Sequence, residues 1–224
     1  MRYTLLIFDW DGTVIDSAAR IVASMQSAAR DLKWPVPDDD AVRNIIGLGL
    51  REALTALFPS STAADREGLV VAYREHFMER CPVPSPLFPD VEPTLAQLRQ
   101  AGFELAIATG KGRQGLNRAL QETGLAGYFT ATRCADETSS KPAPHMVHEL
   151  LAHTGHSARR ALVIGDTEYD MQMARAAGTA ALAVSYGVHS KDRLLRHAPI
   201  ACIDTFSEII QHVTPSVTPH KDES

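Results

Sequence analysis

The chain has 224 residues, of which 45% are hydrophobic and 22% are charged, which is typical of a folded globular protein and excludes a disordered or collagen-like chain. A net charge of −5 at pH 7 disfavours a nucleic-acid partner, because domains that bind nucleic-acid phosphates are usually basic. No apolar run reaches the roughly 18 residues that a membrane span needs, so we expect a cytoplasmic protein with no membrane partner.

The N-terminal third of the chain predicts one strand followed only by helices. Residues 3–8 form a short apolar run that ends in turn residues, which indicates a buried strand. Apolar periodicity and turn residues then predict helices at 17–34, with Ser17 as N-cap, and at 38–46, 50–58 and 63–80. A cluster of prolines between residues 82 and 89 cannot continue a helix and indicates a stiff connector. We therefore assign residues 16–86 to a helical domain.

From residue 91 onward, predicted helices and strands alternate. The predicted strands are apolar throughout, as expected of a parallel sheet that helices cover on both faces. Together with strand 3–8 they predict a doubly wound α/β core formed by residues 1–15 and 87–214, followed by a polar tail at 215–224. In chain order the expected elements are helix 91–100, strand 103–108, helix 112–123, strand 129–133, helix 144–153, strand 161–164, helix 168–177, strand 180–184, helix 192–197, strand 200–203 and helix 207–213.

Four of the predicted strands are followed by residues that can carry chemistry. In an open α/β sheet, the carboxyl ends of the strands border the ligand crevice. Carboxylates are ligands that Mg²⁺ accepts, and hydroxyl, N–H and lysine groups suit a phosphoryl group. We therefore predict Mg²⁺ beside a phosphoryl group. The residues are Asp9 and Asp11 after the first strand, Thr109, Gly110 and Lys111 after the second, Lys141 beyond the third, and Asp166 and Asp170 after the fourth.

These residues resemble the four motifs of the haloacid dehalogenase (HAD) superfamily. The helical segment after the first motif is similar to the C1 cap of that superfamily, and residues 141–144 and 165–167 resemble the phosphoglycolate phosphatase-like branch most. The resemblance spans nearly the whole chain and implies a HAD-like core with a cap inserted after the first strand. The motifs are Asp9-Trp10-Asp11-Gly12-Thr13, Thr109, Lys141 and Gly165-Asp166-Thr167-Glu168-Tyr169-Asp170.

The resemblance implies a Mg²⁺-dependent phosphatase acting on a small phosphorylated metabolite. Asp9 would be the nucleophile that forms an aspartyl-phosphate, and Asp11 would protonate the leaving alcohol and then activate water. Lys141 would neutralise charge on Asp9 and the phosphate. Asp9, Asp166 and the backbone carbonyl of Asp11 would hold Mg²⁺, and Asp170 would orient its waters or Lys141. Phosphatases and phosphomutases keep an aspartate at position 11, whereas dehalogenases lack an acid there.

Five further residues are expected at the substrate. Thr109 and the N–H of Gly110 would bind the transferring phosphoryl oxygens. Many relatives have asparagine where this chain has Gly110, and Lys111 would compensate for the missing donor. In the helical domain, Arg43 and Arg51 lie on either side of a Gly-Leu-Gly segment where the family's specificity loop lies, and they would grip the leaving group. The alternative is an ordinary turn between helices with solvated arginines.

Three other functions are compatible with parts of this pattern. A phosphomutase of the β-phosphoglucomutase type would keep the phosphoryl group on its substrates, so release of inorganic phosphate distinguishes it from a phosphatase. A receiver-like signalling module also combines acidic residues, a threonine and a lysine, but in another order and without a helical cap. A catalytically idle interaction protein on this fold is disfavoured, because every chemically required position is filled.

Overall fold

The computed structural model describes residues 2–214, so the predicted tail at 215–224 lies outside the described residues. Six parallel strands form one sheet in the order β3-β2-β1-β4-β5-β6. This arrangement confirms the predicted doubly wound α/β core. The strands are β1 (Leu5–Phe8), β2 (Glu104–Thr109), β3 (Ala131–Cys134), β4 (Ala161–Gly165), β5 (Ala180–Val184) and β6 (Cys202–Ile203).

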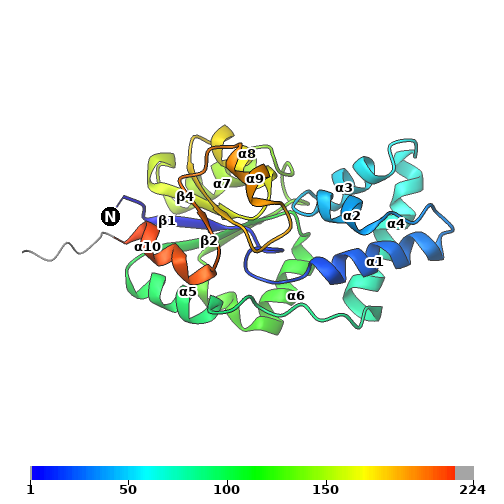
Figure 1. The fold of residues 1–224 in the computed structure, drawn as a ribbon, viewed down its shortest axis with the longest axis horizontal. Coiled ribbons are helices and arrows are strands. Elements are labelled where there is room, and N and C mark those ends of the chain that lie inside the picture. The colour runs from blue at the N-terminus through cyan, green and yellow to red at the C-terminus, as the bar shows by residue number, and fades with distance from the viewer. Residues whose placement is uncertain (1, 215–224) are drawn as a thin grey trace, which may run out of the picture.

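Helices cover both faces of the sheet (Figure 1). In β1, Leu6 and Phe8 pack into the cluster that includes α5, α6 and α10, whereas Leu5 and Ile7 pack against α7 and α8. Because successive side chains of a strand point to opposite faces, burial on both sides explains why β1 is apolar at every position. The helices of this domain are α5 (Val91–Gln100), α6 (Arg113–Thr123), α7 (His145–Thr154), α8 (Glu168–Ala176), α9 (Lys191–Leu195) and α10 (Ile209–Val213), with short 3-10 turns at Leu125–Tyr128, Ala158–Arg160 and Phe206–Glu208.

A separate group of helices packs beside the sheet domain (Figure 1). Their apolar faces form a core of their own, which includes Met25, Val42 and Leu54. The two segments that join this cap to the sheet domain run next to each other, since Ile15 pairs with Leu87. The cap helices are α1 (Ala18–Asp31), α2 (Asp39–Ile45), α3 (Leu50–Leu57) and α4 (Ala63–Glu75), followed by a π-helical turn at His76–Arg80.

The π-helical turn departs from the single helix expected over residues 63–80. The carbonyl of Phe77 accepts hydrogen bonds from Arg20 Nη2 (2.6 Å) and Nε (3.0 Å), which withdraws it from the helical ladder. The N–H of Cys81 then donates to the carbonyl of His76 at 2.8 Å, five residues earlier. The wider turn therefore accompanies a side-chain contact from α1, which residue periodicity does not reveal.

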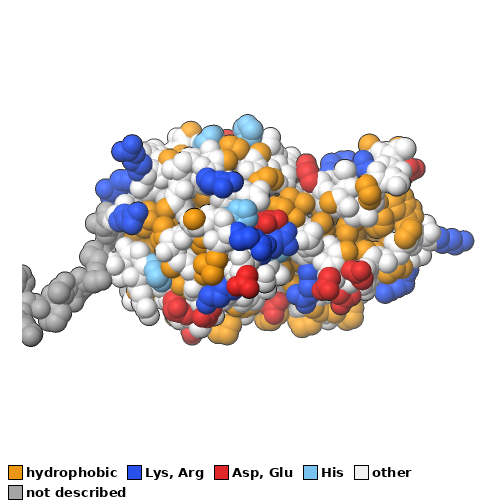
Figure 2. Space-filling model, turned by 45° about the horizontal axis from the view of Figure 1, so that its top comes forward, with side chains coloured by type: hydrophobic (Ala, Val, Ile, Leu, Met, Phe, Trp, Pro, Cys, Tyr) orange, Lys and Arg blue, Asp and Glu red, His pale blue; other side chains and the backbone are white. Residues whose placement is uncertain are grey.

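The outer surface carries charges of both signs. On the face shown in Figure 2, basic and acidic side chains are interspersed, so neither sign dominates it. Within residues 2–214, no helix is both long enough and apolar enough to cross a membrane. Within the described residues, buried charged side chains gather at the carboxyl edge of the sheet.

Candidate active site

Three buried carboxylates surround one lysine at the carboxyl edge of the sheet. Asp9 directly follows β1, Asp166 directly follows β4, and Asp170 lies in the first turn of α8. Oxygens of these three carboxylates lie within 4.8 Å of one another. Lys141 Nζ lies 2.6 Å from Asp9 Oδ1 and 2.7 Å from Asp170 Oδ1. Because β1 and β4 are parallel neighbours, residues far apart in sequence end at one place.

The charges of this cluster are not balanced. The side chains are almost completely buried, with at most 2% of any of these residues exposed. Burial raises the pKa of Asp9 well above its ordinary value, although Lys141 opposes the rise. Burial and the neighbouring Asp170 raise the pKa of Asp166 to about 7. Burial disfavours the charged form of Lys141, but Asp170 and Asp9 outweigh it and raise its pKa. Three carboxylates thus face one ammonium group, which favours an additional cation.

Asp166 is oriented by partners from two distant segments. Thr13 Oγ1 donates to Oδ1 at 2.9 Å, and the N–H of Val188 donates to Oδ2 at 2.9 Å. Glycines allow this approach, because a Cβ at Gly12 or Gly187 would lie 2.2 Å from an Asp166 side-chain atom. Val188 was not identified from the sequence, since it contributes only a backbone group that any residue except proline carries.

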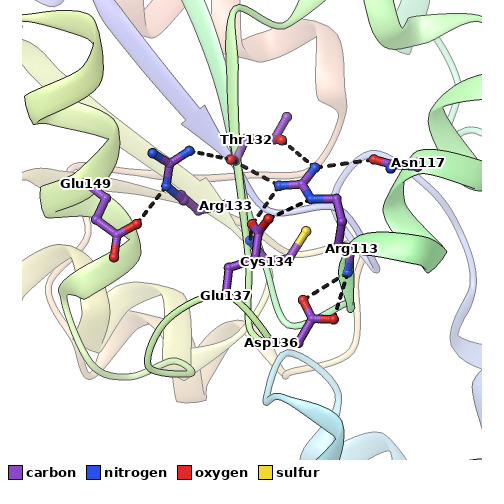
Figure 3. Close-up of polar contacts among 8 residues, drawn as sticks. All are labelled: Arg113, Asn117, Thr132, Arg133, Cys134, Asp136, Glu137 and Glu149. Carbon is purple, nitrogen blue, oxygen red and sulfur yellow. Dashed lines mark hydrogen bonds and ion pairs between the residues drawn. The ribbon is translucent and has the colours of Figure 1, made fainter.

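A network of ion pairs fixes the loop that carries Lys141 (Figure 3). Arg113, at the start of α6, donates to Glu137 from Nε (2.9 Å) and Nη2 (2.6 Å). The Arg113 N–H donates to both carboxylate oxygens of Asp136, at 3.0 and 3.1 Å, which satisfies the first N–H group of α6. Glu137 also accepts from the N–H of Cys134 at 3.0 Å. The loop is therefore tied to β3 and α6 before it reaches Lys141.

Asp11 lies next to the cluster and is held by two groups. Ser17 Oγ donates to Asp11 Oδ1 at 2.6 Å, and Lys111 Nζ lies 3.0 Å from the same oxygen. Ser17 is the N-cap residue of α1, as predicted, but its hydroxyl makes no capping bond to the helix. The Lys111 ammonium also lies 4.4 Å from the centroid of the Phe77 ring of the cap. Thr109 is fully buried, and its Oγ1 accepts from the Lys111 N–H at 3.1 Å.

The glycine-containing loop of the cap docks directly onto Gly110, the residue that follows β2. A Cβ at Gly110 would lie 2.5 Å from the carbonyl oxygen of Leu48 and 2.6 Å from that of Gly47. The N–H of Gly49 donates to Ser140 Oγ at 2.7 Å, next to Lys141. The close contact gives a steric reason for glycine at position 110, where a larger residue would displace the cap loop.

Comparisons with known proteins identify the family of this chain. The haloacid dehalogenase-like hydrolase family model matches residues 6–184. The chain belongs to this family. It is 36% identical to the probable phosphatase IndB of Dickeya dadantii over 92% of this chain and 91% of the relative. It is 27% identical to a phosphoglycolate phosphatase of Colwellia psychrerythraea over 92% of this chain and 95% of the relative. The crystal structure of a haloacid dehalogenase-like hydrolase from Bacteroides fragilis has a TM-score of 0.87 at 25% identity, covering 93% of this chain and all of that one. The resemblance to this superfamily and its phosphoglycolate phosphatase-like branch is confirmed.

In this HAD-like hydrolase, the cap and the sheet domain enclose a cavity of about 430 Å³ that reaches Asp9 and Asp11. Arg51 lines the cavity, but its side chain is 67% exposed and pairs with Glu67 at 2.6 Å. Arg43 is not among the described residues that line the cavity. Of the two arginines expected at the leaving group, the structure therefore brings only Arg51 to the site, and there it already has an acidic partner.

A second contact between cap and sheet domain of the HAD-like hydrolase centres on Asn44 in α2. Tyr169 OH donates to the Asn44 carbonyl at 2.8 Å, and Arg193 Nη1 donates to Asn44 Oδ1 at 2.6 Å. His189 Nδ1 accepts from the Glu168 N–H at 3.0 Å, which assigns the proton of the neutral ring to Nε2, 3.4 Å from the Asn44 carbonyl. Burial lowers the pKa of His189 and favours this neutral form. These contacts hold the cap over the cavity.

Proposed function

We propose that this phosphatase hydrolyses phosphate monoesters of small molecules through an aspartyl-phosphate on Asp9, with Mg²⁺ as its cofactor. The observation that carries the proposal is the state of Asp9. Its Oδ1 lies 2.6 Å from Lys141 Nζ, while the buried Oδ2 has no hydrogen-bond partner among residues 2–214. A buried oxygen without a partner costs folding free energy, so it marks a position where a ligand is expected.

The residues around Asp9 fit a hard divalent cation. Mg²⁺ takes oxygen ligands, often one or two carboxylates together with phosphate and water. Asp9 and Asp166 would hold it, with the backbone carbonyl of Asp11 as the family resemblance implies. Asp170 contacts Lys141 through Oδ1 and accepts from Thr167 Oγ1 through Oδ2 at 2.6 Å, so it would keep the lysine in place. When bound, Mg²⁺ neutralises negative charge on the phosphoryl oxygens and the carboxylates.

The first half of the reaction transfers the phosphoryl group to the protein. An Asp9 oxygen forms a bond to phosphorus while the bond from phosphorus to the alcohol oxygen breaks. Asp11, protonated at this stage, gives its proton to the departing alcohol. The Thr109 hydroxyl and the Gly110 N–H would donate to the phosphoryl oxygens, and Lys141 would offset their charge. Contacts to Asp11 Oδ1 fix the direction in which that side chain acts.

The second half of the reaction returns the protein to its starting state. Water attacks phosphorus, and Asp11, now a carboxylate, takes a proton from that water. The bond between Asp9 and phosphorus breaks, inorganic phosphate leaves, and Asp11 is again protonated. The docked loop that carries Gly47 and Gly49 would limit the access of bulk water to the reacting atoms.

The test is release of inorganic phosphate from a panel of small phosphate esters with Mg²⁺. Asp9→Asn should abolish release, because an amide cannot replace the attacking carboxylate, whereas Asp90→Asn, the same change at an exposed turn, should leave it intact. A chelator should stop turnover, and added Mg²⁺ should restore it. Normal turnover by Asp9→Asn, or undiminished turnover without metal, would refute the proposal. Isomerisation of sugar phosphates without phosphate release would indicate a phosphomutase.

A further inference from the structure

Most of the side chains that line the cavity from the cap are apolar. They are contributed mainly by α1, the segment between α2 and α3, and the end of α4 with the π-helical turn. Four of the apolar side chains are at most 7% exposed, and the others are half-buried. They are Ile21, Met25, Ile45 and Ile46, joined by Leu48, Leu50, Tyr73, Phe77 and Met78.

Most of the charged residues that line the cavity are exposed to solvent. Arg51, Glu52, Arg74 and Asp136 line the cavity but are exposed residues. Lys111 reaches further in, yet its ammonium is already paired with Asp11 and lies over an aromatic ring. Within the described residues, the buried part of this lining therefore offers no unengaged cation for a second anionic group. A carboxylate placed there would lose hydration without gaining a partner.

The size and shape of the cavity add a second constraint. Its volume of about 430 Å³ is within the range of roughly 300–1,000 Å³ that is typical of pockets enclosing whole ligands. This volume is larger than a two-carbon leaving group occupies. Two aromatic rings line it together, since the centroids of Tyr73 and Phe77 lie 5.8 Å apart with their planes inclined by 30°. Flat apolar walls of this kind favour another ring or a comparably broad apolar group.

We propose that the leaving group of the natural substrate is an uncharged, predominantly apolar alcohol about as large as an aromatic ring, held between the cap and the sheet domain. The proposal rests on the phosphatase function proposed above and names its substrate class. It disfavours phosphoglycolate, whose leaving group carries a carboxylate, although a phosphoglycolate phosphatase is among the relatives. The phosphoryl group would lie at Asp9, and the apolar group against the side chains of the cap.

Three esters test separately whether the leaving group is apolar and whether it is uncharged. The ratio of kcat/KM for 2-phenylethyl phosphate to that for ethyl phosphate measures the contribution of apolar burial, and we expect it to be at least about tenfold. Ethyl phosphate compared with phosphoglycolate measures the effect of the carboxylate, and we expect the uncharged ester to be preferred. Equal values for the two uncharged esters would refute an apolar leaving group. A preference for phosphoglycolate would refute an uncharged one.

Cap variants locate the effect in the cavity. Tyr73→Ala should raise KM for 2-phenylethyl phosphate about tenfold while changing KM for ethyl phosphate by less than about twofold. Val71→Ala is the matched control, because Val71 is on the same helix but is 61% exposed and does not line the cavity. Phe77→Leu removes a second ring and provides an independent result if the first variant folds poorly. Equal effects on both esters would contradict the assigned position of the leaving group.

A binding experiment distinguishes failure of this proposal from failure of the phosphatase function. Asp9→Asn is titrated calorimetrically with each ester in the presence of Mg²⁺. We expect 2-phenylethyl phosphate to bind at least about tenfold more tightly than phosphoglycolate, with a negative heat-capacity change from apolar burial. If the wild-type protein releases phosphate from none of the esters but this preference is present, the proposed reaction is wrong and the cavity assignment stands. Absence of the preference would overturn the substrate class itself.

Discussion

Replacing Gly110 by alanine tests whether closure of the cap depends on the absence of a side chain at this position. The added Cβ would lie 2.5 Å from the Leu48 carbonyl oxygen and 2.6 Å from the Gly47 carbonyl oxygen, whereas ordinary contacts of this kind lie at 3.4–4 Å. Both obstructing atoms belong to the backbone and cannot rotate away. The cap loop must therefore move by about 1 Å, which disturbs the neighbouring bond from the Gly49 N–H to Ser140 Oγ.

The size of the effect follows from the cost of overpacking. Inserting a methyl group into a tightly packed contact typically costs about 1–3 kcal/mol. That free energy corresponds to a roughly 5–150-fold shift between the open and docked positions of the cap. If only the docked form binds substrate productively, the measured affinity falls with the population of that form. We expect kcat/KM to decrease by about tenfold or more, with KM raised more than kcat is lowered.

Steady-state release of phosphate from a small ester, together with thermal unfolding, measures this prediction. Gly127→Ala is the matched control, because a Cβ at Gly127 meets no atom within 4 Å and its backbone conformation suits alanine. The control should keep wild-type kinetics. Wild-type kinetics in Gly110→Ala as well would refute the argument that this contact holds the cap, and a similar loss in both variants would show that the effect is not specific to the contact.

Three further predictions concern the groups that position the site. Lys141→Met should lower kcat at least about a hundredfold and destabilise the fold by about 3 kcal/mol at pH 7, because the carboxylates remain buried without their cation. Phosphate release measures the first effect and denaturant unfolding the second. Unchanged turnover would exclude the lysine from the mechanism. Hydrogen bonds from Arg113 lower the pKa of Glu137, so this carboxylate stabilises the fold above its ordinary pKa of 4.5 and the contribution is lost as the pH falls below it. Glu137→Gln should therefore destabilise the protein by about 1 kcal/mol at pH 7, with the difference from wild type disappearing towards pH 3; a difference independent of pH would contradict the ionic origin. Tyr169→Phe removes the hydrogen bond to Asn44 at the second contact of the cap and should raise KM a few-fold with little change in kcat, whereas a loss confined to kcat would argue against a role in docking.

Several features of this fold were predictable because they depend on local patterns. Burial on both faces makes a central parallel strand apolar at every position, which identified β1 from its sequence alone. Four strands, β1, β2, β3 and β6, begin one or two residues later than expected, because pairing with a neighbour and not residue type decides where a strand starts and ends. Asp9 and Asp166 could be expected to meet, since both follow strands of a parallel sheet.

Other parts of the site depend on contacts that local patterns do not encode. Ser17 precedes a helix and is of a type that usually caps one, but in the folded chain its hydroxyl reaches Asp11. The Val188 N–H orients Asp166, and a backbone group carries no residue signature. The loop that carries Lys141 is held by Arg113 and Glu137, whose types are equally common on solvated surfaces.

The amino-acid sequence by itself determined the family, the order of the elements and the acidic residues and lysine expected to act on a phosphoryl group, because these depend on residue type and on spacing along the chain. Only the tertiary structure decided how the cap lies on the sheet domain. That placement pairs Lys111 with Asp11, brings the cap carbonyls against Gly110 and leaves an apolar cavity beyond Asp9. Such contacts join segments that fold around different cores, and their geometry is set by packing between the two domains, which no periodicity within either one specifies.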